Sequence, residues 1–80
     1  MEVPVILKVL IKLFATLRDG RFKMETWELP AATHVGKILQ DLDIGVEEVA
    51  IILVNGRNVE EEYVLHDGDT LALFPPVGGG

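Results

Sequence analysis

The stretch from Asp67 to Gly80, DGDTLALFPPVGGG, predicts the last strand of a small sheet and the segment that leaves it. An Asp-Gly-Asp turn leads into the strand, which we expect over Thr70–Phe74. Pro75 and Pro76 follow directly, and each lacks the N–H that another strand hydrogen bond needs. The sheet should therefore stop at Phe74.

We expect residues 1–74 to form one domain, followed by a flexible tail that ends in Gly-Gly. The tail consists of Pro75, Pro76, Val77, Gly78, Gly79 and Gly80. Its glycines have no Cβ, so this backbone fits a channel too narrow for side chains, with the carboxylate of Gly80 as the reactive group. Fully extended, the tail reaches about 20 Å. Glycine-rich ends are also often only disordered, and the glycines alone do not exclude that alternative.

The composition limits the chemistry available to the chain. Its 80 residues suffice for one domain, and they include no cysteine and no serine. Disulfides, thiolate metal sites and cysteine or serine nucleophiles are thereby excluded. His34 and His66 lie far apart in the sequence, so we expect structural or solvent-facing histidines and no metal site.

Charge and hydropathy limit the partners. The formal net charge is −6, which would repel nucleic acid. Acidic runs such as Glu60–Glu62 form either a solvated surface or a match to basic enzymes. The apolar run Val3–Phe14 is interrupted by Pro4 and by lysines, and it is too short to span a bilayer. We therefore expect no nucleic-acid or membrane partner and a cytoplasmic location.

The first strand is predicted over Val5–Phe14, which is rich in β-branched residues and has evenly spaced lysines. Strand alternation places Val9, Ile11 and Leu13 on one face and the lysines on the other, wetter face. A second strand is expected over Phe22–Leu29.

The second strand should end at Pro30. Phe22 is out of phase with Trp27, which implies either a bulge or a partly exposed aromatic side chain. Trp27 itself is expected in the core or at its edge.

One short helix is predicted next. Its apolar residues follow the i, i+3, i+4, i+7 spacing of a helix face: Val35, Ile38, Leu39 and Leu42. Thr33 is expected as the N-cap, and Gly45 as the left-handed residue after the helix.

A buried strand and a hairpin should follow the helix. Every residue from Val49 to Val54 is apolar, which indicates a strand covered on both faces. Asn55 and Gly56 predict a tight turn into Arg57–Val59, and the segment after it crosses back to the last strand.

This order of elements predicts an α+β fold of the β-grasp type, with a mixed sheet of four to five strands packed on one main helix. The residues expected to face the helix are Ile11, Leu13, Leu29, Ile52, Val54, Leu71 and Leu73. Alternation leaves an apolar strip on the uncovered side, and such a strip is most simply a partner interface. The strip consists of Phe14, Ile51, Leu53, Ala72 and Phe74. A phase error of one residue would instead return some of these side chains to the core.

From about Ile11 onward, the chain resembles the MoaD/ThiS family of ubiquitin-like sulfur carriers. The resemblance is carried by LFATLR at Leu13–Arg18, by VNG at Val54–Gly56, and most specifically by the stretch Asp67–Gly80. The passage FPPV in that stretch is more similar to MoaD, the small subunit of molybdopterin synthase, than to the thiazole-forming ThiS type.

The resemblance implies a carrier protein and not an enzyme. An ATP-dependent activating enzyme of the MoeB/ThiF type would adenylate the carboxylate of Gly80, and a sulfur donor would convert it to a thiocarboxylate. The sulfur would pass to a molybdopterin precursor held by the large subunit of molybdopterin synthase. The chain itself would bind no cofactor, because the activating enzyme uses the ATP. By the same resemblance, Phe14 and Phe74 lie on the surface that faces the partner.

Several alternatives stay open at this point. Arg18 is either a further partner contact or a solvated side chain. The acceptor of the sulfur is a molybdenum or tungsten pterin, a thiazole as in thiamine-type carriers, a cysteine precursor or a transfer RNA. The tail is also compatible with a ubiquitin-like modifier joined through Gly80 to a lysine of another protein, or with a plain binding module whose tail is inert.

Overall fold

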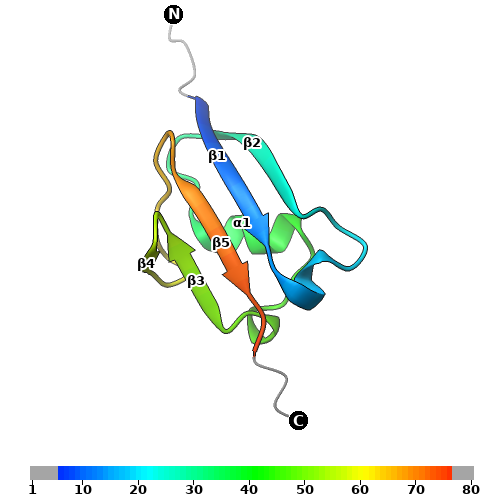
Figure 1. The fold of residues 1–80 in the computed structure, drawn as a ribbon. Coiled ribbons are helices and arrows are strands. Elements are labelled where there is room, and N and C mark those ends of the chain that lie inside the picture. The colour runs from blue at the N-terminus through cyan, green and yellow to red at the C-terminus, as the bar shows by residue number, and fades with distance from the viewer. Residues whose placement is uncertain (1–5, 77–80) are drawn as a thin grey trace, which may run out of the picture.

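The computed structural model describes residues 6–76 of the chain. In this part the elements follow the predicted order, and Figure 1 labels the strands and the α-helix. They are β1 (Ile6–Leu13), the 3-10 helix η1 (Ala15–Arg18), β2 (Met24–Pro30), α1 (Val35–Asp41), the 3-10 helix η2 (Val46–Glu48), β3 (Ile51–Val54), β4 (Arg57–Asn58) and β5 (Thr70–Phe74).

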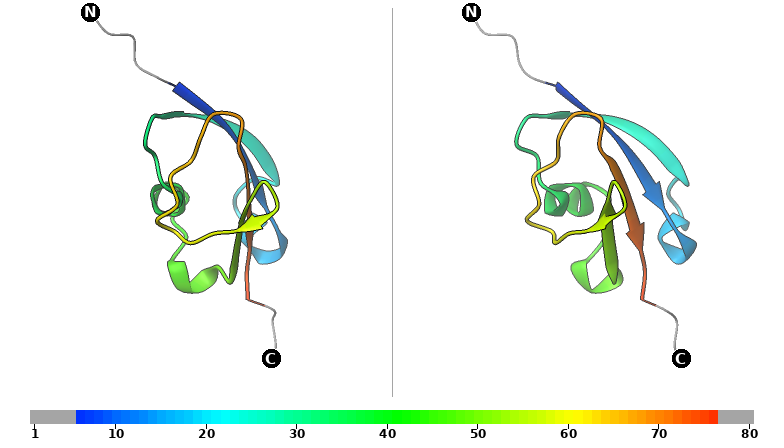
Figure 2. Two further views of the ribbon diagram at one scale, coloured as in Figure 1. Left: turned by 90° about the vertical axis from the view of Figure 1, so that its left-hand side faces the viewer. Right: turned by 60° about the vertical axis from the view of Figure 1, so that its left-hand side comes forward.

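The strands form one five-stranded mixed sheet in the order β2-β1-β5-β3-β4. β1 and β5 are parallel neighbours, whereas the other neighbouring pairs are antiparallel. α1 packs on one side of the sheet, and within residues 6–76 no second layer covers the other side, as Figure 2 shows. We call this uncovered side the open face. The arrangement is the β-grasp fold, so the predicted fold class is confirmed.

Alternation along β1 separates the two faces as the sequence predicts. Val9, Ile11 and Leu13 are fully buried, whereas Lys8 is exposed and Lys12 is half-buried. The other residues predicted to face the helix are buried in the core or packed against it: Leu29, Ile52, Val54, Leu71 and Leu73. Their burial fixes the strand register, because a slip of one residue would turn them all to the open face.

The start of the helix differs from the prediction for Thr33. His34 is the N-cap, and its Nδ1 accepts a hydrogen bond from the Lys37 N–H at 3.2 Å. Thr33 is buried, and its Oγ1 donates to the Pro30 carbonyl at 2.6 Å. Thr33 therefore stabilises the turn before the helix. Of the predicted apolar face, Val35, Ile38 and Leu39 are buried in α1, whereas Leu42 is the C-cap and is half-buried.

The end of the helix differs from the prediction for Gly45. Gly45 has a φ of −72° and precedes η2. The left-handed residue is Asp43, with a φ of 59°, and the Ile44 N–H donates to the Leu39 carbonyl at 2.9 Å. Aspartate tolerates this conformation because its short polar side chain can form local hydrogen bonds. The preference for glycine therefore pointed to the wrong residue.

β3 is less covered than its apolar sequence predicts. Val54 is buried, but Ile51 is 40% exposed. The prediction of a strand covered on both faces is therefore wrong. The reason is that the seven-residue helix α1 covers only one side of the sheet, so the outward side chains of β3 stay on the open face.

β2 pairs with β1 in an unbroken register, from Ile6 opposite Pro30 to Lys12 opposite Met24. The predicted break in phase is therefore not a bulge. Phe22 lies before the strand, and its ring centroid is 6.0 Å from that of Trp27. Both rings are half-buried at the edge of the core, so the alternative of a partly exposed aromatic is confirmed.

The hairpin at Asn55 and Gly56 is also confirmed. Their φ values are 53° and 83°, and a two-residue turn between antiparallel strands favours such positive values. The turn joins β3 to β4, which contains two residues and excludes Val59, the predicted end of this strand.

Candidate partner-binding face and C-terminal exit

Phe14 and Phe74 stack at the ends of the two central strands. Their ring centroids are 4.2 Å apart and their planes differ by 10°. The parallel pairing of β1 with β5 places Leu13 beside Leu73, and the Phe14 N–H donates to the Leu73 carbonyl at 3.2 Å. Both rings are half-buried. We call these two residues the aromatic pair; the sequence named each of them, and the fold brings them into contact.

Arg18 is held against the aromatic pair. After Phe14, η1 turns the chain, and the Arg18 Nε donates to the Leu13 carbonyl at 2.8 Å. Its guanidinium carbon lies 5.6 Å from the ring centroid of Phe14, within the range of a cation–π interaction. The exposed side chain is therefore oriented by the protein, and its terminal N–H groups lie beside an aromatic surface.

An apolar strip continues from the aromatic pair across β5 and β3. Ile51 is opposite Phe74 and Leu53 is opposite Ala72 in the strand register. Ile51 is exposed, while Leu53 and Ala72 are half-buried. Contiguous exposed apolar side chains are typical of binding surfaces. The structure thus places all five residues predicted for a partner interface on or beside the open face: Phe14, Arg18, Ile51, Leu53 and Phe74.

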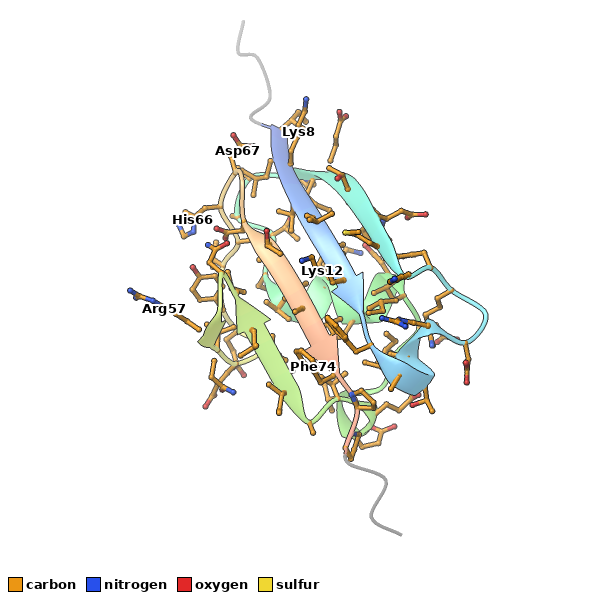
Figure 3. All side chains as sticks on the ribbon, viewed as in Figure 1. Lys8, Lys12, Arg57, His66, Asp67 and Phe74 are labelled. Carbon is orange, nitrogen blue, oxygen red and sulfur yellow. The ribbon has the colours of Figure 1, made fainter. Side chains whose placement is uncertain are left out.

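The chain leaves the sheet next to this surface, just after Phe74 (Figure 3). The Phe74 carbonyl accepts a hydrogen bond from the Ala50 N–H at 2.8 Å. Pro75 is half-buried and Pro76 is exposed, and both border a hollow that is also lined by residues of η1 and η2. The remaining predicted tail residues lie outside the described part of the chain: Val77, Gly78, Gly79 and Gly80.

The two histidines occupy different positions. His34 caps α1, while His66 Nδ1 lies 3.8 Å from the Asp69 carboxylate. Within residues 6–76, no three potential ligand side chains of histidine, cysteine, aspartate or glutamate are grouped as a metal site. No helix in this part of the chain is long and apolar enough to cross a membrane.

The sequence did not single out a basic pocket beside the aromatic pair. Lys12, Lys23 and Met24 line this pocket together with Phe14 and Arg18. Alternation along β1 places Lys12 on the open face. The sequence predicts Lys23 in the second strand, over Phe22–Leu29, but β2 begins at Met24 and Lys23 belongs to the loop between η1 and β2. No periodic pattern predicts the path of that loop.

A β-grasp body with an aromatic open face and a proline-marked exit from its last strand is of the ubiquitin-like class. The chain belongs to the ThiS family, whose family model matches residues 11–80. This match confirms the resemblance to the MoaD/ThiS family.

Solved structures of related proteins agree with this assignment. A protein described as molybdopterin converting factor, subunit 1, from Pyrococcus furiosus is 32% identical, with 89% of this chain and 99% of that chain covered and a TM-score of 0.71. Small archaeal modifier protein 1 from Haloferax volcanii is 26% identical, with 89% and 99% covered and a TM-score of 0.73. A complex of subunits 1 and 2 of the molybdopterin-converting factor from Helicobacter pylori contains a chain that is 25% identical, with 92% and 100% covered and a TM-score of 0.57. No curated protein sequence matches the chain.

Proposed function

We propose that this protein is a sulfur carrier in which the carboxylate of Gly80 is activated and converted to a thiocarboxylate. The proposal rests on the position at which the chain leaves the sheet. β5 ends at Phe74, a member of the aromatic pair, and Pro75 and Pro76 follow directly. A partner that binds the open face would therefore have the tail at its own surface. Membership of the ThiS family supports this role.

The proposed reaction has two steps, and partner enzymes supply the catalytic groups. In an activating enzyme of the MoeB/ThiF type, a carboxylate oxygen of Gly80 attacks the α-phosphorus of ATP and pyrophosphate leaves. With sulfide as donor, the sulfur then attacks the acyl carbon and AMP leaves, because the adenylate is a far better leaving group than a carboxylate oxygen. The products are the thiocarboxylate, AMP and a proton.

We propose a molybdopterin precursor, held by the large subunit of a molybdopterin synthase, as the acceptor of the sulfur. The similarity to a molybdopterin converting factor subunit from P. furiosus supports this acceptor. The H. pylori relative occurs in a complex with a second subunit, which supports a partner of that type.

Two alternatives use the same activated tail. A thiamine-type carrier would deliver its sulfur to a thiazole. A protein modifier would instead form an amide between Gly80 and a lysine of a target protein. The similarity to small archaeal modifier protein 1 supports this alternative.

The test is to incubate the protein with an activating enzyme, ATP and sulfide and to determine its intact mass. We expect the mass to rise by the difference between sulfur and oxygen, and the variant that lacks Gly80 to stay unchanged. Covalent adducts with other proteins would support the modifier instead. The positive control is a reaction in which the same enzyme thiocarboxylates its own carrier. If that reaction succeeds and the mass of this protein stays unchanged, both the sulfur-carrier and the modifier role would be excluded.

A further inference from the structure

The basic pocket lies on the side of the aromatic pair that is away from β3. It has a volume of about 170 Å³ and is lined by Lys12, Leu13, Phe14, Arg18, Lys23 and Met24. Small-molecule sites usually measure roughly 300–1,000 Å³. This pocket is therefore of a size that suits a single amino-acid side chain.

The walls of the pocket combine apolar and cationic groups. Met24 is 52% exposed, and Phe14 is the member of the aromatic pair that lines the pocket. Lys12, Arg18 and Lys23 supply three positive charges in a chain whose net charge is −6. The local charge is thus opposite to that of the protein as a whole.

None of these three cations forms a close ion pair within the described part of the chain. Within residues 6–76, Lys37 pairs with Asp41 and His66 Nδ1 lies 3.8 Å from the Asp69 carboxylate, and neither contact involves Lys12, Arg18 or Lys23. Arg18 is oriented by the Leu13 carbonyl and the Phe14 ring, so its guanidinium has already lost part of its rotational freedom. A group that is held in place before binding costs less entropy when it binds.

We propose that this pocket binds a protein segment in which a carboxylate side chain neighbours a large apolar side chain. The apolar side chain would enter between Phe14 and Met24, and the carboxylate would lie among Lys12, Arg18 and Lys23. Charge complementarity selects this occupant, and the pocket is continuous with the proposed partner face. The inference rests on the proposed function only in assigning the segment to the partner enzyme.

The pocket also makes the two halves of the open face different in charge. The half formed by β3 and β5 presents Ile51, Leu53 and Ala72, which are uncharged. The half formed by β1, β2 and η1 presents the cations. A partner with an acidic group on one side of an apolar patch would be favoured in the orientation that brings this group to the cations.

The proposal can be tested with the full chain alone, without activating enzyme or ATP. The probe is a capped hexapeptide of alternating leucine and glutamate, titrated to millimolar concentration while backbone amide chemical shifts are recorded by NMR. A peptide with glutamine in place of glutamate is the matched control. We expect saturable shifts at the amides of Phe14, Arg18 and Met24 with the acidic peptide only.

Charge variants make the test specific. The double variant Lys12→Gln and Lys23→Gln should bind roughly three- to tenfold more weakly, on the scale of two exposed charge pairs. The double variant Lys8→Gln and Arg57→Gln removes the same charge at sites away from Lys12 (Figure 3) and should bind as the parent does. The dispersion of the NMR spectrum shows whether each variant is folded.

The outcomes separate the possible occupants. Shifts centred on β3, equal binding of both peptides, equal weakening of both double variants, or no saturable binding would each overturn the proposal. Shifts at the pocket that appear when the protein alone is concentrated would assign it to a second copy of this chain and would also overturn it. Because no thiocarboxylate is involved, these results are independent of the mass experiment.

Discussion

Asp69 and Asn55 join the last strand to the central hairpin through their side chains. The Asn55 Nδ2 donates to Asp69 Oδ1 at 2.8 Å, while Asn55 Oδ1 accepts the Thr70 N–H at 3.0 Å. The second carboxylate oxygen of Asp69 accepts the His66 N–H at 2.8 Å. Asp69 is only 7% exposed, so it is a buried polar side chain with its hydrogen bonds satisfied. The contact fixes the turn from which β5 starts toward the tail.

Replacing Asp69 should therefore destabilise the fold. We expect Asp69→Ala to lower the free energy of unfolding by about 1–3 kcal/mol, because two part-buried hydrogen bonds, from Asn55 Nδ2 and the His66 N–H, lose their acceptor. Urea unfolding followed by circular dichroism measures this loss. Asp19→Ala is the control, since Asp19 is exposed, and it should change the value by less than about 0.5 kcal/mol. Equal losses for both variants would contradict the role of the contact.

Arg21 should be the most important cation for stability. Its guanidinium donates to the carbonyls of Leu42, Leu17 and Asp43 at 3.0, 3.2 and 3.1 Å, so it ties the loop after η1 to the end of α1. We expect Arg21→Gln to cost about 1.5–3 kcal/mol of unfolding free energy, the scale of hydrogen bonds to a charged group. Arg21→Lys should recover little of this, because an ammonium lacks the planar fork that reaches several carbonyls. Full recovery by lysine would show that charge alone matters.

The strand faces could be predicted from the sequence, but the helix ends could not. Burial of one sheet face imposes a period of two, which is why the inward side of β1 and the outward position of Phe14 follow from alternation. The helix ends depend on contacts from other parts of the chain. Arg21 reaches the carbonyl of Asp43 from a separate loop, and the Leu65 N–H donates to the Thr33 carbonyl at 2.8 Å. The sequence preferences of capping residues contain no information about such contacts.

In the candidate site, too, single residues could be predicted from the sequence, whereas the contacts between them could not. Phe14 and Phe74 could be named separately by alternation and resemblance, but their stacking follows from the parallel register of β1 and β5. The contact of Arg18 with Phe14 depends on the turn made by η1, which no sequence pattern predicted.

The stacking predicts an energetic coupling between Phe14 and Phe74. In a double-mutant cycle of Phe14→Ala and Phe74→Ala, we expect the losses of unfolding free energy to be non-additive by about 0.5–1.5 kcal/mol. Denaturant unfolding of the four proteins gives this value. A cycle of Phe14→Ala with Tyr63→Ala is the control, because Tyr63 packs against His66 instead, and it should be additive within about 0.5 kcal/mol. Additivity in both cycles would mean that the observed ring contact contributes no stability.

A substitution of Ile51 should affect partner binding more than it affects the free energy of unfolding. Ile51 is 40% exposed and lies opposite Phe74, whereas Leu71 is fully buried in the same sheet. Leu71→Ala should cost about 2–5 kcal/mol of unfolding free energy, and Ile51→Ala should cost less because 40% of its surface stays in contact with water, whereas Leu71 is fully buried.

Ile6→Ala provides the matched control for Ile51. Ile6 is the same residue type, is 49% exposed, and lies at the start of β1, the end of the sheet opposite the exit of the tail (Figure 1). In the thiocarboxylation assay we expect Ile51→Ala to raise the KM for this protein and Ile6→Ala to leave it unchanged, because only Ile51 adjoins the aromatic pair. The same KM for both variants would show that the activating enzyme does not contact the β3 half of the open face, and the partner surface would then have to be confined to β1, β2 and η1.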